Sequence, residues 1–157
     1  MKFALANARR TMQDSVVISF FFNARGERLE KSTIGTYRSL LLQLLDKLPA
    51  LHYVFDSLGI SGSSISTHYQ WSVESLKALL EQAIKGLGKT SVVCFIDALD
   101  ECEELQIRDM ISFFEHVGQL AVAAGIQFYV CFSSRHYPHI TIQKNVELVL
   151  EGQEGHS

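Results

Sequence analysis

The sequence feature that most restricts the fold is an unbroken apolar run that ends in acidic residues. Residues 92–96 read Val-Val-Cys-Phe-Ile, and Asp97, Asp100 and Glu101 follow at once. A short apolar run without polar alternation is typical of a strand that is buried on both faces of its sheet. We therefore expect a sheet that is covered by other layers, with carboxylates at the end of one of its strands.

The remainder of the chain alternates between strand-like and helix-like segments. Further apolar runs predict strands at 16–22, 126–132 and, more weakly, 146–150. The spacing of apolar residues predicts amphipathic helices between the runs, at 32–48, 72–87 and 107–124. This alternation predicts an α/β fold, a three-layer sandwich with a mostly parallel sheet, in which ligands bind at the carboxyl ends of the strands.

Composition and charge narrow the range of partners. The chain has 157 residues, 47% of them hydrophobic, which suits one domain over residues 1–157 with a substantial core. A formal net charge of −3 gives no bulk attraction to nucleic acid or to an anionic membrane, and neither is expected as a partner. No segment is long enough for a membrane span, and Cys94, Cys102 and Cys131 suit buried thiols in a reducing compartment. The expected location is cytoplasmic.

The acidic residues after the 92–96 run suggest metal and phosphate chemistry. A carboxylate just past a buried strand can hold a hydrated Mg²⁺, and a second one a few residues on can orient water at a γ-phosphate. Asp97 suits the metal role, and Asp100 or Glu101 the catalytic one. The alternative is that four acids occupy the first turn of the next helix, where negative charge interacts favourably with the helix dipole: Asp100, Glu101, Glu103 and Glu104.

The block Ile96–Cys102 resembles the Walker B region of NACHT domains in STAND-class P-loop NTPases. The resemblance is closest to the fungal type, also called nephrocystin-like N-terminal domains. Three further blocks agree in order and spacing, at Ser19–Gly26, Tyr37–Leu45 and Cys131–Arg135. The resemblance covers essentially the whole chain. It implies that Arg135 occupies the sensor position that contacts the γ-phosphate of a bound nucleotide; the alternative is a loop arginine paired with a surface acid.

The sequence departs from this family pattern at its start. In the family, a strand and a Gly-x-x-x-x-Gly-Lys-Ser/Thr loop precede the helix whose tail is predicted at residues 1–12, and these 157 residues contain neither. Asp97 alone cannot replace the phosphate contacts of that loop. The absent strand is expected between the 126–132 and 146–150 strands, so its loss predicts two open inner sheet edges and marginal stability.

Two other motifs are set aside. Gly86–Thr90 contains Gly-Lys-Thr, but it joins a predicted helix to a following strand, whereas a phosphate loop joins a strand to a following helix. His136 and His139 flank Pro138, which favours a turn with solvated histidines over a metal site.

The resemblance implies a partial nucleotide-binding core. The intact parent binds Mg²⁺ with ATP or GTP and switches between inactive and assembled forms, in innate immunity or fungal non-self recognition. This chain alone is expected to be inactive and to bind no cofactor tightly; its partners are nucleotide in the parent, other NACHT-type proteins or its own missing segments. An alternative is a non-enzymatic module that associates with intact relatives through open sheet edges. A weaker one is a metal-dependent phosphohydrolase that uses Asp97 and Asp100.

Overall fold

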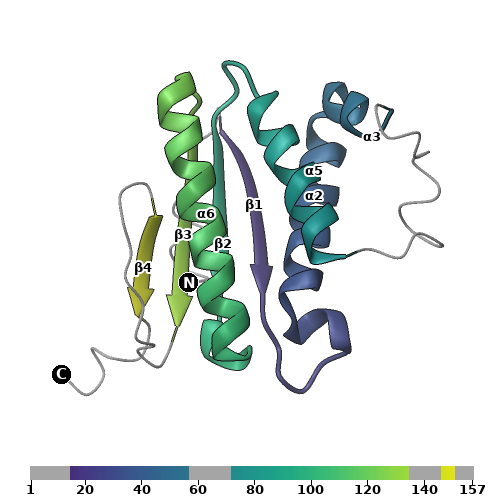
Figure 1. Ribbon diagram of the computed structural model, residues 1–157. Helices are drawn as coiled ribbons and strands as arrows, with labels where there is room; N and C mark the ends of the chain where they lie inside the picture. The colour runs from purple at the N-terminus through teal and green to yellow at the C-terminus, as the bar shows by residue number, and fades with distance from the viewer. Residues whose placement is uncertain (1–14, 57–71, 135–145, 151–157) are drawn as a thin grey trace.

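The chain forms a parallel four-stranded sheet with helices packed against it (Figure 1). The computed structural model describes residues 15–56, 72–134 and 146–150. The strands lie in the order β1 (Val16–Phe21), β2 (Val92–Asp97), β3 (Phe128–Ser134) and β4 (Val146–Leu150). Every neighbouring pair is parallel, which confirms the predicted α/β class and strand direction.

The prediction of an open gap between the third and fourth strands is wrong. β3 pairs directly with β4, in a register that runs from Val130 opposite Val146 to Ser134 opposite Leu150. Buried backbone N–H and C=O groups require partners, and β4 supplies them to the edge of β3 that lies away from β2. The inner edges that led us to expect marginal stability are therefore not open in this structure.

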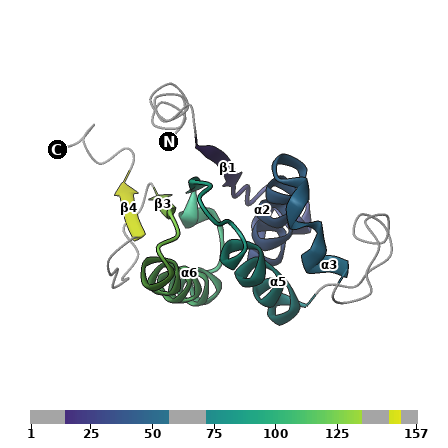
Figure 2. The same cartoon turned by 90° about the horizontal axis from the view of Figure 1, so that it is seen from above.

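Three long helices, α2 (Thr33–Lys47), α5 (Val73–Lys85) and α6 (Glu104–Ala124), lie on one side of the sheet (Figure 2). Short elements connect them to the strands: η1 (Arg28–Lys31), η2 (Pro49–His52), α3 (Tyr53–Asp56) and η3 (Leu99–Glu101). The helix boundaries follow the predicted signals. Ser72 caps α5 by accepting the Ser75 N–H at 3.1 Å, and Gly125 ends α6 with φ +72°.

Both faces of β2 are buried. Along β2, Val92, Cys94 and Ile96 face the helices and join the main core. Alternation directs Val93 and Phe95 to the opposite face, where they form a second cluster with Val17 of β1. Burial on both faces explains why the β2 sequence is apolar without alternation.

The outer edge of β1 is covered by side chains from α2. The Gln43 amide accepts the Ser19 N–H through Oε1 at 3.0 Å and donates from Nε2 to the Ser19 carbonyl at 2.8 Å. Lys47 Nζ donates to the Val17 carbonyl one step earlier on the same edge. These contacts satisfy backbone groups that an edge strand otherwise leaves open for pairing.

Candidate functional site

Asp97 is the last residue of β2, an internal strand of the sheet, and it lies at the carboxyl end. The Phe22 N–H donates to its carbonyl at 3.1 Å, which ties the end of β1 to the end of β2. Alternation along β2 places the half-buried Asp97 side chain on the face away from the helices, like Phe95. Oδ1 accepts the Ala98 N–H at 2.7 Å, and Oδ2 has no hydrogen bond to any residue that the structure describes.

The backbone turns sharply after Asp97. Ala98 has φ 62° and ψ 44°, a left-handed conformation that costs a residue with a side chain about 1 kcal/mol or more. Leu99 then enters the core at 2% exposure and anchors η3. The turn stops β2 at Asp97 and separates it from the acidic residues of η3.

Asp100 and Glu101 lie in η3, and α6 begins only at Glu104. The alternative that acids from Asp100 to Glu104 occupy the first turn of the next helix holds for Glu104 in α6, whereas Asp100 and Glu101 lie in the separate short turn η3. Glu101 Oε1 accepts the Ala24 N–H at 3.2 Å, so this carboxylate links the loop after β2 to the loop after β1. The contact is a structural use of Glu101; its catalytic role stays a prediction.

Ser133 is the residue that sequence reasoning missed at this site. It lies on β3, is 0% exposed, and its hydroxyl has no hydrogen-bond partner within the described part of the chain. Ile96 is in register with Phe132, so Asp97 and Ser133 occupy the next positions of the two neighbouring strands and share a face. No sequence pattern marks Ser133, because a buried hydroxyl without a partner becomes evident only from tertiary packing.

These residues fit a hydrated Mg²⁺. Mg²⁺ in proteins is held by one or two carboxylates and keeps several waters, so it needs no dedicated cage. Within the residues that the structure describes, no three His, Cys, Asp or Glu side chains form a metal cluster. Asp97 with its open Oδ2, next to an orphaned buried hydroxyl, matches the sparser oxygen site that Mg²⁺ uses.

Other predicted residues are placed elsewhere or lie outside the described residues. Arg135, His136 and His139 lie outside them. The Gly86–Thr90 segment joins α5 to the amino end of β2, the end opposite Asp97, so the Gly-Lys-Thr sequence has the geometry expected of a non-phosphate turn.

All three cysteines are free thiols. Cys94 is fully buried in the main core, and burial raises the pKa of its thiol far above the ordinary value. Burial also raises the pKa of Cys102, to about 11. A raised pKa keeps a thiol protonated and unreactive at neutral pH, so Cys94 and Cys102 suit the predicted structural role.

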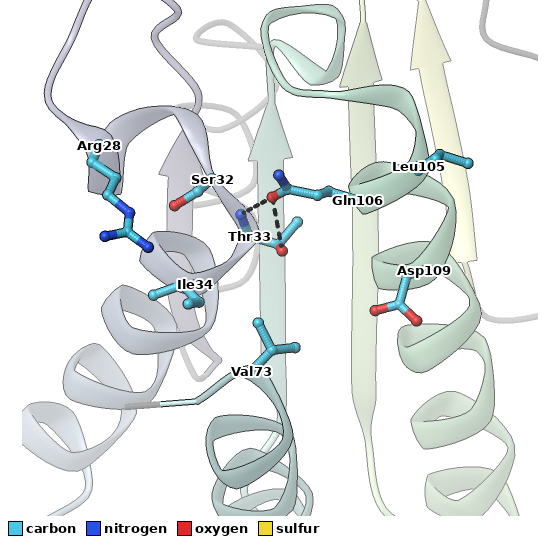
Figure 3. Close-up of a pocket in the computed structure, with 8 residues that line it drawn as sticks. All are labelled: Arg28, Ser32, Thr33, Ile34, Val73, Leu105, Gln106 and Asp109. Atoms are coloured by element: carbon cyan, nitrogen blue, oxygen red, sulfur yellow. Dashed lines mark hydrogen bonds between the residues drawn. The ribbon is translucent and has the colours of Figure 1, made fainter. Parts of the chain in front are cut away.

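A pocket of about 410 Å³ lies in the helical layer, at the amino ends of α2, α5 and α6 (Figure 3). Gln106 of α6 closes one side by accepting the Thr33 N–H at 3.1 Å and the Thr33 hydroxyl at 3.3 Å through Oε1. The eight lining residues are Arg28, Ser32, Thr33, Ile34, Val73, Leu105, Gln106 and Asp109. Of the predicted site residues, the three that the structure describes, Asp97, Asp100 and Glu101, do not line this pocket.

The parallel sheet, its helical layer and the acidic end of β2 define a P-loop-like α/β sandwich. Residues 1–135 match the family described as nephrocystin 3, N-terminal, and the chain belongs to this family. No curated protein and no solved structure matched the chain. Among the described helices, none combines the length and apolar character needed to cross a membrane.

Proposed function

We propose that this chain is a partial nucleotide-binding core of a STAND-class signalling NTPase of the NACHT type. In the intact parent, Mg²⁺ with ATP or GTP would switch the protein between inactive and assembled forms, as in innate immune or fungal non-self signalling. The observation that carries the proposal is the position of Asp97, at the carboxyl end of an internal parallel strand with one carboxylate oxygen open. Membership of the nephrocystin 3 N-terminal family supports it.

Each predicted residue would have a separate role at the carboxyl end of the sheet. Asp97 would hold the hydrated Mg²⁺, which when bound neutralises phosphate charge. Asp100 and Glu101 follow on η3, from which a carboxylate would orient water at the γ-phosphate. Arg135, directly after β3, would detect whether that phosphate is present. Glu101 also accepts a hydrogen bond from the Ala24 N–H, which links η3 to the loop after β1.

The chain alone is expected to hydrolyse nucleotide negligibly. Its 157 residues include no Gly-x-x-x-x-Gly-Lys-Ser/Thr loop, whose backbone N–H groups would cradle the phosphates and whose Lys would reach the β- and γ-phosphates. Tight binding of ATP or GTP therefore requires that this loop be supplied by another segment or another NACHT-type protein.

The test is complementation. The chain is titrated with fluorescent ATP and GTP analogues in Mg²⁺, with and without a peptide that carries a strand and a phosphate loop. We expect binding only with the peptide, and we expect Asp97→Asn to abolish it. Asp109→Asn, a change on the far helical layer, is the matched control and should leave it intact. Association of the peptide without any nucleotide binding would overturn the proposal.

The alternative of a module that associates through open inner edges has less support. The β3 edge is paired with β4, and α2 covers the β1 edge at Val17 and Ser19. In the complementation experiment, tight association with an intact relative in the absence of nucleotide would favour that alternative.

A further inference from the structure

We propose that Ser133 helps to hold the metal at this site through a metal-bound water, acting beside Asp97. Its hydroxyl would hydrogen-bond a water molecule of the hydrated Mg²⁺. Asp97 Oδ2, on the neighbouring strand, would hold the same hydrated ion. The inference rests on the proposed nucleotide function, which assigns Mg²⁺ to Asp97, and it adds a residue to which the sequence resemblance gives no role.

The first argument is the unpaired hydroxyl. Buried polar side-chain atoms in folded proteins nearly always have a hydrogen-bond partner, and an exception requires an explanation. Ser133 is 0% exposed, and its Oγ has no partner within the described residues. A serine hydroxyl can donate and accept hydrogen bonds, so it can accept one from a water molecule that is bound to a metal ion. A bound, hydrated cation supplies the missing partner.

The second argument is register. The parallel pairing of β2 with β3 continues through Ile96 opposite Phe132, which brings Asp97 and Ser133 next to one another. Neighbouring strands lie about 4.8 Å apart, a separation that a single water can bridge between two side chains on one face. Ser134, the next residue, belongs to the opposite face by alternation and is 1% exposed.

The third argument is the local charge. Asp97 Oδ1 is occupied by the Ala98 N–H, which leaves Oδ2 as the acceptor toward a cation. Val93 and Phe95, which precede Asp97 on the same face, are buried apolar residues. One carboxylate with one hydroxyl and several waters is an oxygen-only, sparsely ligated arrangement, which favours Mg²⁺ over metals that prefer nitrogen or sulfur ligands.

The experiment measures metal binding without nucleotide. Mn²⁺, which substitutes for Mg²⁺ and is visible by electron paramagnetic resonance, is titrated into the full chain and into single variants. We expect Ser133→Ala to weaken Mn²⁺ binding about tenfold, as loss of an outer-shell partner does. Ser133→Thr keeps the hydroxyl and should retain the affinity, whereas Asp97→Asn should lose more than Ser133→Ala. Ser134→Ala is the matched control and should bind Mn²⁺ as the unaltered chain does.

Thermal unfolding separates this role from a structural one. Ser133→Ala removes an unpaired buried hydroxyl, so the melting temperature without metal should stay the same or rise. Absence of Mn²⁺ binding to the unaltered chain would overturn the inference. Equal Mn²⁺ affinity for Ser133→Ala and the unaltered chain would also overturn it. In that case the peptide could still restore Asp97-dependent nucleotide binding, so the proposed function would stand. Conversely, a Ser133-dependent Mn²⁺ site without nucleotide complementation would overturn only the proposed function.

Discussion

At the scale of single residues, Gly35 is a position at which the fold leaves no room for a side chain. A Cβ at Gly35 would lie 1.6 Å from the Leu29 carbonyl oxygen, because η1 packs directly on the first turn of α2. Gly35→Ala must displace backbone, and we expect the free energy of unfolding to fall by about 3 kcal/mol in urea denaturation. Gly88→Ala is the control: that site is open with φ +61°, so only about 1 kcal/mol should be lost. Equal losses would show that η1 moves freely.

Tyr37 carries the second unpaired buried hydroxyl of the described residues. Its side chain is 0% exposed and its ring contacts Phe113 at 5.5 Å between centroids. Tyr37→Phe keeps the ring and removes the desolvated hydroxyl, so we expect the free energy of unfolding to rise by about 1 kcal/mol. Tyr37→Leu, which also loses the ring contact, should be less stable than the unaltered chain. A clear loss of stability in Tyr37→Phe would mean that the hydroxyl has a partner in solution.

At the scale of elements, one amide of α2 makes two of the hydrogen bonds to the outer edge of β1. Gln43 satisfies both the N–H and the carbonyl of Ser19 on the outer edge of the sheet. Gln43→Leu leaves both groups without these partners, so we expect the free energy of unfolding to fall by about 2 kcal/mol. An exposed edge also pairs with other chains, so self-association should increase in size-exclusion chromatography. Gln43→Glu keeps the acceptor for the Ser19 N–H, so its free energy of unfolding should lie between those of the unaltered chain and of Gln43→Leu. A Gln43→Leu variant as stable as the unaltered chain and fully monomeric would contradict this account.

Sequence patterns predicted the positions of the helices and their ends well, because both depend on residues that are close together in the sequence. The apolar spacing placed α2, α5 and α6, and the Ser72 and Gly125 signals marked helix ends, since capping depends on residues within one turn. The pairing of β3 with β4 could not be predicted this way. A strand sequence records how many of its faces are buried, but it does not record which strand lies beside it.

The candidate site likewise has one residue that the local sequence predicts and one that depends on tertiary structure. Asp97 could be found from sequence, because an acid that ends an apolar run is visible in the run itself. Ser133 could not, since an unpaired hydroxyl becomes evident only when tertiary packing removes water from it and register sets it beside Asp97. The Gln106 contact to Thr33 joins positions 73 residues apart and was likewise outside the reach of pattern reasoning.

At the scale of the whole molecule, ionisable groups buried in separate parts of the core predict loss of stability at alkaline pH. Burial raises the pKa of the Cys94 thiol, on β2, and of the Tyr37 phenol, on α2, above their ordinary values of 9.0 and 10.0. Burial likewise raises the pKa of Cys102 to about 11. Well below pH 9 these groups hold their protons in both the folded and the unfolded chain, so their contribution to stability is constant there.

Above pH 9 the unfolded chain releases these protons first, and the free energy of unfolding must fall as pH rises. Well above pH 9, the fully buried Cys94 alone should contribute a slope that approaches about 1.4 kcal/mol per pH unit; the measurement is urea denaturation under reducing conditions, repeated from about pH 7 to about pH 10.5. Cys94→Ala should be less stable at pH 7, because it leaves a small cavity, yet its stability should decline less steeply with pH. Cys102→Ala should lower the slope by a similar amount up to about pH 10.5, because the Cys102 thiol, whose pKa is raised to about 11, also stays protonated there in the folded chain. If the stabilities of the unaltered chain and of Cys94→Ala declined in parallel, the Cys94 thiol would add no pH dependence to the free energy of unfolding. That result would mean that the thiol ionises in the folded chain as well, because water reaches the β2 core without global unfolding.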